Sequence, residues 1–214
     1  MTVYGVSPMP RKSKKPTVNA YFGDRAEDYS SQAWMARNQQ RTSRRAVALL
    51  FEPKLGPMAV ALDESSLVLD AACGSGYSSE VLEADGLPLV GIDLSRDMLA
   101  HAVAKGFTVV NCDMRCLPFR ERVFAHGISI SGLNFVAAGA NTLVEVGQKY
   151  FKAASEFARV VHAGSRFVIE YYPSSQDEVD QSLAAFKRAG FRGFLVVDNP
   201  GGRKEQKYLV IEKE

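Results

Sequence analysis

The sequence predicts a single-domain α/β fold in which helices cover both faces of a doubly wound, mostly parallel sheet of seven strands. From residue 67 to residue 190, short apolar runs rich in β-branched residues alternate with stretches of helical periodicity. This alternation is typical of right-handed crossovers between parallel strands. Two last apolar runs, at 193–197 and 207–211, have no helix between them and suit an antiparallel pair that closes the sheet.

The individual elements follow from these runs. Parallel strands are expected at 67–71, 88–92, 107–111, 124–131 and 167–171, and helices at 77–85, 95–104, 143–162 and 175–189. Ser95 is a suitable N-cap for the second of these helices, because its hydroxyl can accept a hydrogen bond from a free backbone amide. Gly164 and Gly190 are expected to stop the last two helices. Residues 132–135 are expected to form a loop.

Length and composition indicate one ordinary domain. The chain has 214 residues, of which 46% are hydrophobic, enough to bury a full core. We expect a disordered basic N-terminal tail at 1–17 and a globular domain at 18–214, with an N-terminal helical lid at 24–51. No apolar stretch approaches the roughly 20 residues of a membrane span, and the N-terminus lacks the apolar core of a signal peptide. We therefore expect an intracellular protein, either cytoplasmic or, in a eukaryote, nuclear or nucleolar.

The cysteines and the charges narrow the class further. Cys73, Cys112 and Cys116 are odd in number and lack partners at zinc-like spacing, so reduced thiols and no metal site are expected. Net charge is only +2, but basic residues gather in a run at 11–15 and again on the helical stretch 37–45. These two groups are either a solvated tail and helix face or an electrostatic footprint for nucleic-acid phosphates.

The stretch 67–78 has the features of a nucleotide-binding loop. Its apolar run ends at Asp70, and Gly74 and Gly76 follow, where backbone freedom lets the chain turn against a ligand before the next helix begins. Such a turn alone is weak evidence, because glycine turns between strand and helix also serve packing. The next two strands end at Asp93 and Asp113, and a carboxylate about 20 residues after the glycine loop can bind ribose hydroxyls.

Dinucleotide-binding folds share the glycine loop and the second acidic residue. The third acidic strand end and the small loop favour S-adenosylmethionine instead. We expect Asp93 to bind the ribose, Asp113 the adenine amino group with Met114 beside the ring, and the glycine loop the methionine portion. Asp70 would orient the loop and the cofactor's ammonium group. The remaining residues expected to border the cofactor are Tyr29, Cys73, Leu94, Met98 and Ser131.

The loop after the fourth strand is expected to receive the methyl acceptor. It contains no His, Lys or Cys that could act as a base or nucleophile, and His126 lies within the strand, where a core role is expected. A ring nitrogen with a free lone pair needs no proton removed, so proximity and alignment can suffice. Asn134 could then hydrogen-bond a base edge while Phe135, Tyr171 or Tyr172 stacks on its face. Alternatively, Phe135 and Tyr171 simply fill the core.

Three segments carry a family resemblance. They are "LDAACGSGYSSEVLEADGLPLVGIDLSRDMLAHAV", "CDMRCLPFRERVFAHGISISGLNF" and "EYYPSSQDEVDQSLAAFKRAGFRGFLVVDNPGGRKEQKYLVI". Together they resemble the small-subunit ribosomal RNA guanine-N7 methyltransferases over nearly the whole chain after residue 19. The resemblance implies a Rossmann-like fold that uses S-adenosyl-L-methionine. It places cofactor contacts at Asp70, Cys73, Gly74, Gly76, Asp93, Asp113 and Met114, and a target-base pocket at Ser131, Asn134, Phe135, Tyr172 and Pro173.

The chain departs from the family pattern at several positions. Ala72 stands where the glycine loop usually has its first glycine, which costs little if its backbone angles are ordinary. Asn134-Phe135 replaces a usual Gln-Trp, Ser174-Ser175 replaces a usual Glu-Asn, and the lysine-rich C-terminal tail of eukaryotic members is absent. The changes at 134–135 and 174–175 affect the residues that would read the guanine.

The resemblance also implies a protein partner. Family members work with a small zinc-binding activator protein that covers an exposed sheet edge. In the usual strand order the strand at 107–111 lies at an edge, and Phe107, Val109 and Val110 would make it apolar. The other expected partner is ribosomal RNA or a precursor of the small subunit, and no membrane partner is expected.

Two other functions are compatible with the same residues. A methyltransferase for a small metabolite or quinone would use the same loop and the same acidic strand ends. A non-catalytic ribosome assembly factor would contribute to maturation by its presence alone. Removal of the basic run at 11–15 would leave the first activity unchanged, and an Asp93→Ala variant that keeps full biological function would favour the second.

Overall fold

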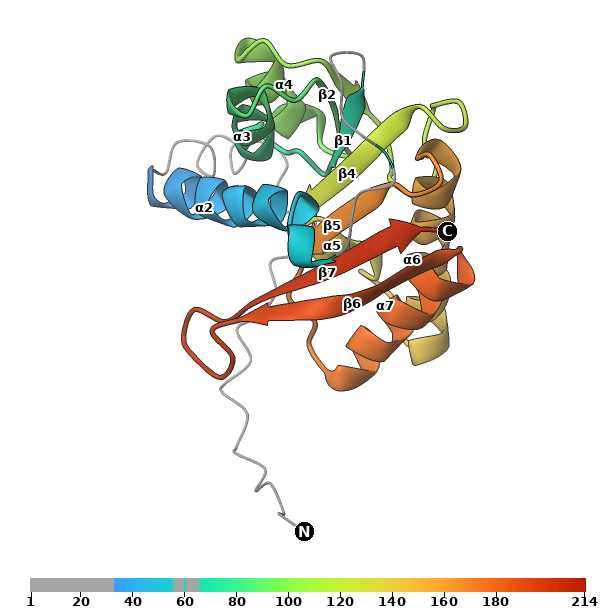
Figure 1. Ribbon diagram of the computed structural model, residues 1–214. Helices are drawn as coiled ribbons and strands as arrows, with labels where there is room; N and C mark the ends of the chain where they lie inside the picture. Colours follow the sequence, from blue (N-terminus) through green and yellow to red (C-terminus); the bar gives the residue numbers. More distant parts are fainter. Residues whose placement is uncertain (1–32, 56–59, 61–65) are drawn as a thin grey trace.

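A computed structural model of the chain describes residues 33–55, 60 and 66–214. Its core is a seven-stranded sheet of order β3-β2-β1-β4-β5-β7-β6 (Figure 1). The first five strands run parallel, and β7 is antiparallel to both β5 and β6. The predicted doubly wound, mostly parallel sheet is therefore confirmed. The strands are β1 Leu67–Ala71, β2 Leu89–Asp93, β3 Val109–Asn111, β4 Phe124–Ile130, β5 Arg166–Glu170, β6 Phe191–Asp198 and β7 Gln206–Lys213.

Helices lie on both faces of the sheet (Figure 1). In the described residues they are α2 Ala33–Leu50, α3 Tyr77–Ala84, α4 Arg96–Ala104, α5 Leu133–Val136, α6 Leu143–Val160 and α7 Gln176–Arg188, with a short 3₁₀ helix at Pro53–Leu55. Ser95 caps α4 as predicted, since its Oγ accepts a hydrogen bond from the Met98 N–H at 3.2 Å. The short α5 occupies the predicted loop 132–135, so that prediction is wrong. Because it has only four residues, it is too short to show helical periodicity.

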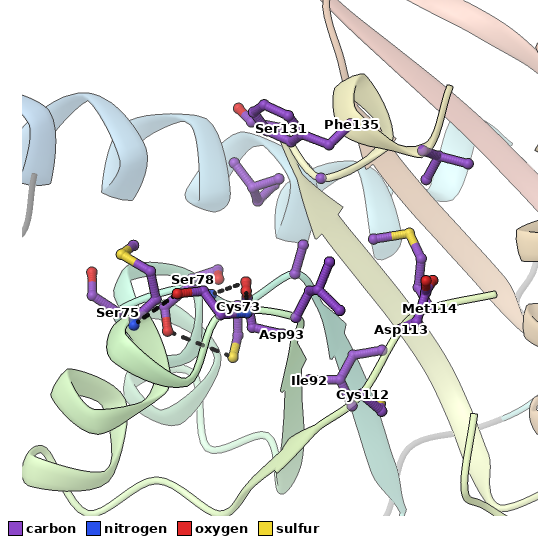
Figure 2. A pocket seen from close by; sticks show the side chains of 18 of the residues that line it. Cys73, Ser75, Ser78, Ile92, Asp93, Cys112, Asp113, Met114, Ser131 and Phe135 are labelled. Carbon is purple, nitrogen blue, oxygen red and sulfur yellow. Dashed lines mark hydrogen bonds between the residues drawn. The ribbon is translucent and has the colours of Figure 1, made fainter. Parts of the chain in front are cut away.

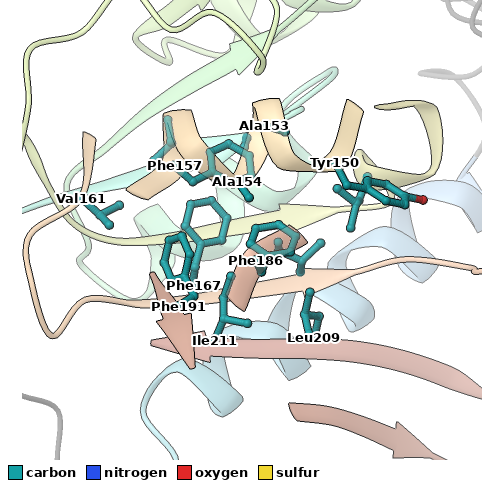
Figure 3. Packing of buried hydrophobic residues seen from close by; sticks show 14 of the residues in the cluster. Tyr150, Ala153, Ala154, Phe157, Val161, Phe167, Phe186, Phe191, Leu209 and Ile211 are labelled. Carbon is teal, nitrogen blue, oxygen red and sulfur yellow. The ribbon is translucent and has the colours of Figure 1, made fainter. Parts of the chain in front are cut away.

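The larger core cluster lies under α6 and α7 and is dominated by phenylalanine (Figure 3). The rings of Phe157 and Phe167 stack with centroids 4.5 Å apart, and Phe186 meets Phe191 edge to face at 5.8 Å. Gly127 on β4 is required here, since an added Cβ would lie 2.2 Å from the Phe167 ring. Aromatic bulk on one strand thus fixes a glycine on its neighbour.

The opposite face of the sheet is covered by α2 and α3. Ala46, Leu49 and Leu50 of α2 are buried in a cluster with residues of β1, β4, β5 and β7. The Arg166 side chain, which is only 2% exposed, donates from Nη1 to the Leu50 carbonyl oxygen at 2.8 Å and so satisfies a free carbonyl at the end of α2. The described part of the predicted lid 24–51 is thus α2. Residues 1–32, including the predicted tail at 1–17, lie outside the described residues.

His126 is a core residue, as expected. It is fully buried on β4, with Nδ1 accepting the Arg166 backbone N–H at 3.0 Å and Nε2 3.0 Å from the Val60 carbonyl oxygen. A nitrogen that accepts and a nitrogen that faces a carbonyl together require the neutral ring protonated at Nε2. Burial lowers the pKa of this imidazole. His126 therefore serves structure and contributes no catalytic base.

Several element boundaries differ from the predictions. The edge strand begins at Val109, and Phe107 precedes it with its side chain buried, so it does not belong to the apolar edge. Its ring lies 2.9 Å from the point where a Cβ on Gly76 would stand. Helix α6 ends at Val160, before the predicted stop at Gly164, because Val161 already forms a bridge with Phe124. Gly190 follows Ala189, the C-cap residue of α7, and has φ +87, as expected.

Candidate active site

A pocket of about 340 Å³ opens at the carboxyl ends of the parallel strands (Figure 2). This is where an α/β sheet with reversed strand order binds its ligands. Its wall comes from the glycine loop, the ends of β2, β3 and β4, helix α5, and Gln39 of α2. The predicted site residues among those that line it are Cys73, Gly74, Asp93, Leu94, Met98, Asp113, Met114, Ser131 and Phe135.

The glycine loop is held against β2 by its backbone. The Cys73 N–H donates to the Ile92 carbonyl oxygen at 2.9 Å, and the Gly74 N–H donates to Asp93 Oδ2 at 2.9 Å. Gly74 has φ +54 and lines the pocket. Gly76 has φ +86 but does not line the pocket and packs on Phe107 instead. One glycine therefore serves the pocket and the other the packing of the loop.

Ala72 adopts a left-handed backbone conformation with φ +62. The condition under which this substitution would cost little is therefore not met. In the left-handed conformation the Cβ atom lies too close to the following carbonyl oxygen, which destabilises the residue by roughly 1–2 kcal/mol. The loop folds as a glycine loop even though its first glycine is missing, and it holds strain at the pocket wall.

Asp70 lies beneath the loop, fully buried and outside the pocket lining. Its Oδ2 accepts hydrogen bonds from the hydroxyls of Ser78 and Ser79, both at 2.7 Å. Burial raises the pKa of the Asp70 carboxyl to about 6. This carboxylate thus positions the loop by holding the first turn of α3.

Asp93 stands at the end of β2 and lines the pocket. Its Oδ2 accepts the Gly74 N–H, and its Oδ1 accepts the Ser95 N–H at 2.8 Å. Burial raises the pKa of this carboxyl. Each oxygen still has a second lone pair, so the side chain can accept hydrogen bonds from two neighbouring hydroxyl groups.

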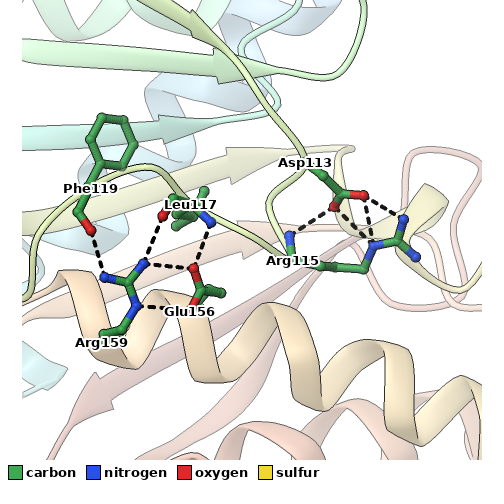
Figure 4. Close-up of polar contacts among 6 residues, drawn as sticks. All are labelled: Asp113, Arg115, Leu117, Phe119, Glu156 and Arg159. Atoms are coloured by element: carbon green, nitrogen blue, oxygen red, sulfur yellow. Dashed lines mark hydrogen bonds and ion pairs between the residues drawn. The ribbon is translucent and has the colours of Figure 1, made fainter.

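Asp113 is engaged by a residue that the sequence reasoning missed (Figure 4). Arg115 donates to its Oδ1 from the backbone N–H and from Nε, both at 2.9 Å, and these hydrogen bonds hold the pKa of Asp113 below its usual value. Arg115 also lines the pocket. The signal for this pair was an arginine two residues after a strand-end carboxylate.

The thiols of Cys73 and Cys112 line the pocket, and both stay protonated. Burial raises the pKa of Cys73, and it raises that of Cys112 to about 11. All three cysteines of the chain are free. Within the described ranges, no cluster of three or more His, Cys, Asp or Glu side chains could hold a metal ion. The pocket thiols are therefore neutral at physiological pH and unsuited to nucleophilic attack.

Glu170, at the end of β5, is the second residue that the sequence reasoning missed. Its Oε2 accepts both the backbone N–H of Ser131, at 3.0 Å, and the Ser131 hydroxyl, at 2.9 Å. Ser131 lines the pocket with φ +61. Glu170 is fully buried, and burial raises its pKa. A search for carboxylates at strand ends, which found Asp70 and Asp93, would have found Glu170 as well.

Asn134 links the segment that follows β4 to the segment that follows β5. Its Oδ1 accepts the Tyr172 backbone N–H at 2.6 Å, and its Nδ2 donates to the Ser131 carbonyl oxygen at 2.9 Å. Tyr172 is 43% exposed. Neither Tyr172 nor Pro173 lines the pocket. The amide of Asn134 thus holds the loops together.

Two further candidates for the site have different outcomes. Tyr171 is fully buried, with its hydroxyl 2.8 Å from Ser182 Oγ, so it is a core residue and cannot stack on a base. Phe135 lines the pocket from α5 (Figure 2). Tyr29 lies outside the described residues.

Residues 68–164 match the family model described as a methyltransferase domain. Over 191 residues the chain is 30% identical to the 18S rRNA (guanine-N7)-methyltransferase of Schizosaccharomyces pombe, and the match covers 87% of this chain and 67% of that protein. The chain belongs to the 18S rRNA guanine-N7 methyltransferase family. The resemblance identified from the sequence motifs is therefore confirmed.

Another member of the 18S rRNA guanine-N7 methyltransferase family has the same level of identity. The 18S rRNA (guanine(1575)-N(7))-methyltransferase of Saccharomyces cerevisiae is 30% identical over 184 residues, which cover 84% of this chain and 63% of the yeast protein. The chain thus spans slightly less than two thirds of that relative. None of the helices in the described ranges has the length and apolar character of a membrane span.

The fold of this family member is similar to that of a solved methyltransferase. The magnesium protoporphyrin IX methyltransferase of Synechocystis, whose crystal structure holds S-adenosylmethionine, superimposes with a TM-score of 0.64. The similarity covers 92% of this chain and 95% of that one at 17% identity. At this identity the likeness establishes the fold alone, and it supports the predicted Rossmann-like architecture.

Proposed function

We propose that this protein transfers a methyl group from S-adenosyl-L-methionine to N7 of a guanine in small-subunit ribosomal RNA during ribosome biogenesis. The observation that carries the proposal is the pocket in which Asp93 lies beside Gly74 at the carboxyl edge of the sheet. It is supported by family relatives that bear the name of this activity. The reaction takes place inside the cell, in the cytoplasm or the nucleus.

The residues that line the pocket fit the proposed cofactor. Asp93 would accept hydrogen bonds from the ribose hydroxyls, and Cys73 and Gly74 would border the methionine portion. Ile92, Cys112 and Met114 offer apolar surface for the adenine ring, with Asp113 as acceptor for its amino group. Leu94 and Met98 would close the rim. When bound, S-adenosylmethionine supplies an electrophilic methyl group on a sulfonium centre.

The acceptor side of the pocket suits a nucleophile that carries its own lone pair. Among the described residues that line the pocket there is no histidine or lysine, and the thiols of Cys73 and Cys112 stay protonated. Guanine N7 needs no proton removed, so the protein has only to place the base in line with the methyl group. Phe135 would stack on the base, and Asn134, Tyr172 and Pro173 would shape the entrance.

The test is methyl transfer to immature small ribosomal subunits with a labelled methyl donor. We expect label in one guanine of the small-subunit RNA, located by borohydride and aniline cleavage, which breaks RNA at N7-methylguanine. Asp93→Ala should abolish donor binding and labelling together. Label that enters only metabolites or proteins would contradict the proposal.

We also propose that a small zinc-binding activator protein pairs with the edge strand β3. Support comes from the position of β3 at the end of the sheet, where Val109 and Val110 are partly exposed beside unpaired backbone groups. Co-expression with such a partner should raise the yield and activity of the chain. Val109→Pro removes a backbone N–H that faces away from β2, so it should abolish this gain. A chain that is fully soluble and active alone would count against the partner.

A further inference from the structure

The outer face of helix α2 carries an unusual set of side chains. Its exposed residues recur at intervals of three and four positions, so they form one stripe along the helix. We call this the arginine stripe, and its members are Trp34, Arg37, Arg41 and Arg44. Trp34 is 58% exposed. The 18 residues of α2 include no Asp or Glu that would balance these charges.

Three carboxylates on elements that neighbour α2 are paired with other cations. Asp198, at the end of β6, forms two hydrogen bonds with the Arg45 guanidinium at 2.7 and 3.1 Å. Glu80 of α3 pairs with Lys105 at 2.7 Å, and Glu205 pairs with Lys207 at 3.0 Å. Among the described residues, no ion pair is formed by five exposed cations on α2 and the β6–β7 turn: Arg37, Arg41, Arg44, Arg203 and Lys204.

The stripe lies beside the pocket. Gln39 lines the pocket from the inner side of α2. Thr42, on the same helix, accepts a hydrogen bond from Gln206 Nε2 at 2.7 Å, and Gln206 also interacts with the phenol of Tyr172. The helix therefore forms a wall between the pocket and the arginine stripe. A polymer whose one base enters the pocket would therefore lie close to the helix that carries the stripe.

We propose that the arginine stripe, together with Arg203 and Lys204 of the β6–β7 turn, binds a single-stranded segment of RNA next to the methylated nucleotide. The arginines would pair with backbone phosphates, and Trp34 would stack on a base. This inference rests on the proposed function for the class of ligand. It adds the surface that holds the RNA outside the pocket.

Charge and shape favour RNA over an anionic membrane. A helix that lies in a membrane interface needs a free apolar face. The apolar face of α2, with Ala46, Leu49 and Leu50, is buried on the sheet. Trp34 alone offers a large exposed apolar group on the stripe. Unpaired cations with one aromatic ring are instead the combination that binds single-stranded nucleic acid.

The test measures RNA binding in the absence of the methyl donor, so that it does not depend on activity. The full-length protein is titrated with a fluorescent single-stranded fragment of small-subunit RNA at several salt concentrations. Each phosphate contact to a single strand contributes about 0.7 to the slope of log K against log salt. The triple variant Arg37→Gln, Arg41→Gln, Arg44→Gln should therefore lower this slope by about 2.

A matched control variant removes an equal number of positive charges from another part of the surface. Arg120 lies just before the amino end of the central strand β4, and Lys152 and Lys187 lie on α6 and α7, across the sheet from α2. All three are exposed. The triple variant Arg120→Gln, Lys152→Gln, Lys187→Gln should keep the wild-type slope. The triple variant Arg37→Lys, Arg41→Lys, Arg44→Lys should keep it too, because the positive charges of the stripe remain. Unchanged melting temperatures would establish that the variants are folded.

Trp34 gives an independent readout, because it is the only tryptophan in the chain. We expect the RNA to quench its fluorescence and anionic vesicles to leave it unchanged. An unaltered slope in the stripe variant, an equal loss in the control, no RNA binding by the wild type, or a response to vesicles alone would each overturn the inference. RNA binding that follows these expectations without methylation would contradict only the proposed activity.

Discussion

The carboxylate of Glu170 accepts two hydrogen bonds from Ser131, one from its backbone N–H and one from its hydroxyl. This contact joins the end of β5 to the loop after β4, where Ser131 has φ +61. The buried carboxylate thereby holds a strained residue at the pocket wall. Glu170 is a positioning residue, because it acts on the pocket through Ser131.

We expect Glu170→Ala to leave the Ser131 hydroxyl without its acceptor, whereas the Ser131 N–H keeps the Glu170 backbone carbonyl oxygen at 2.9 Å. The loss should destabilise the protein by about 1–3 kcal/mol. The acceptor loop would then shift, and kcat should fall about tenfold or more, since small displacements of positioned groups are costly. Glu170→Gln keeps one acceptor oxygen and should retain more activity. Chemical denaturation and single-turnover methyl transfer measure the two effects. Equal kcat in both variants would contradict the positioning role.

A second prediction concerns Arg115, which donates hydrogen bonds to Asp113, the carboxylate that we propose binds the adenine amino group. Both oxygens of Asp113 already accept hydrogen bonds from Arg115, so the adenine amino group must compete with it. Arg115→Ala should therefore tighten cofactor binding by about threefold, which corresponds to about 0.6 kcal/mol. Asp113→Ala should weaken binding instead. Isothermal titration calorimetry distinguishes these outcomes, and weaker binding in both variants would show that Arg115 itself supports the adenine.

A third prediction follows from the conformation of Ala72. Glycine at this position would remove the cost of roughly 1–2 kcal/mol of a left-handed alanine but would add freedom to the unfolded chain worth about 0.4–1 kcal/mol. Ala72→Gly should therefore stabilise the protein by about 0.5 kcal/mol and raise Tm by about 1–2 °C. The control is Ala71→Gly at the buried end of β1, which should lower Tm. A lower Tm for Ala72→Gly would show that its methyl group contributes essential packing.

The fourth prediction concerns pH. Burial raises the pKa of Asp70 to about 6, above the usual value for aspartate. At pH values between these two, the folded state holds a proton that the unfolded state releases. This contribution to stability is fully present below the unfolded pKa and is lost as pH rises through about 6. Asp70→Asn does not titrate, so its stability relative to wild type should increase between pH 4 and pH 6.5, by about 3 kcal/mol at most. Urea denaturation across this range measures the difference, and a constant difference would contradict the raised pKa.

The sequence predicted the parts of the fold that depend on local patterns. The capped helix at Ser95, the parallel strands and the antiparallel pair β6–β7 follow from periodicity and turn residues, and they are confirmed. The burial of the Phe107 side chain could not be predicted from the neighbouring sequence. It depends on the space beside Gly76, which only the packed structure defines.

The candidate site divides in the same way. Asp93 and Gly74 could be placed because strand ends meet at one edge of a parallel sheet. Arg115 and Glu170 could not be assigned a role in advance, because each acts through a hydrogen bond that depends on the packed loops. Tyr171 and Tyr172 are adjacent, yet one is fully buried and the other is exposed. Alternation along an extended segment puts neighbours on opposite sides, but the sequence does not say which side faces the pocket.

His126 has a consequence for how the molecule tolerates acid. Because burial lowers the pKa of its ring, protonation in the unfolded state reduces stability as pH falls below about 6.5. Asp70, whose pKa is raised, changes stability in the opposite sense over an overlapping range. A buried base on one strand and a buried acid on its neighbour thus change stability in opposite directions as the pH falls. Removal of either group should leave the dependence on pH that is due to the other.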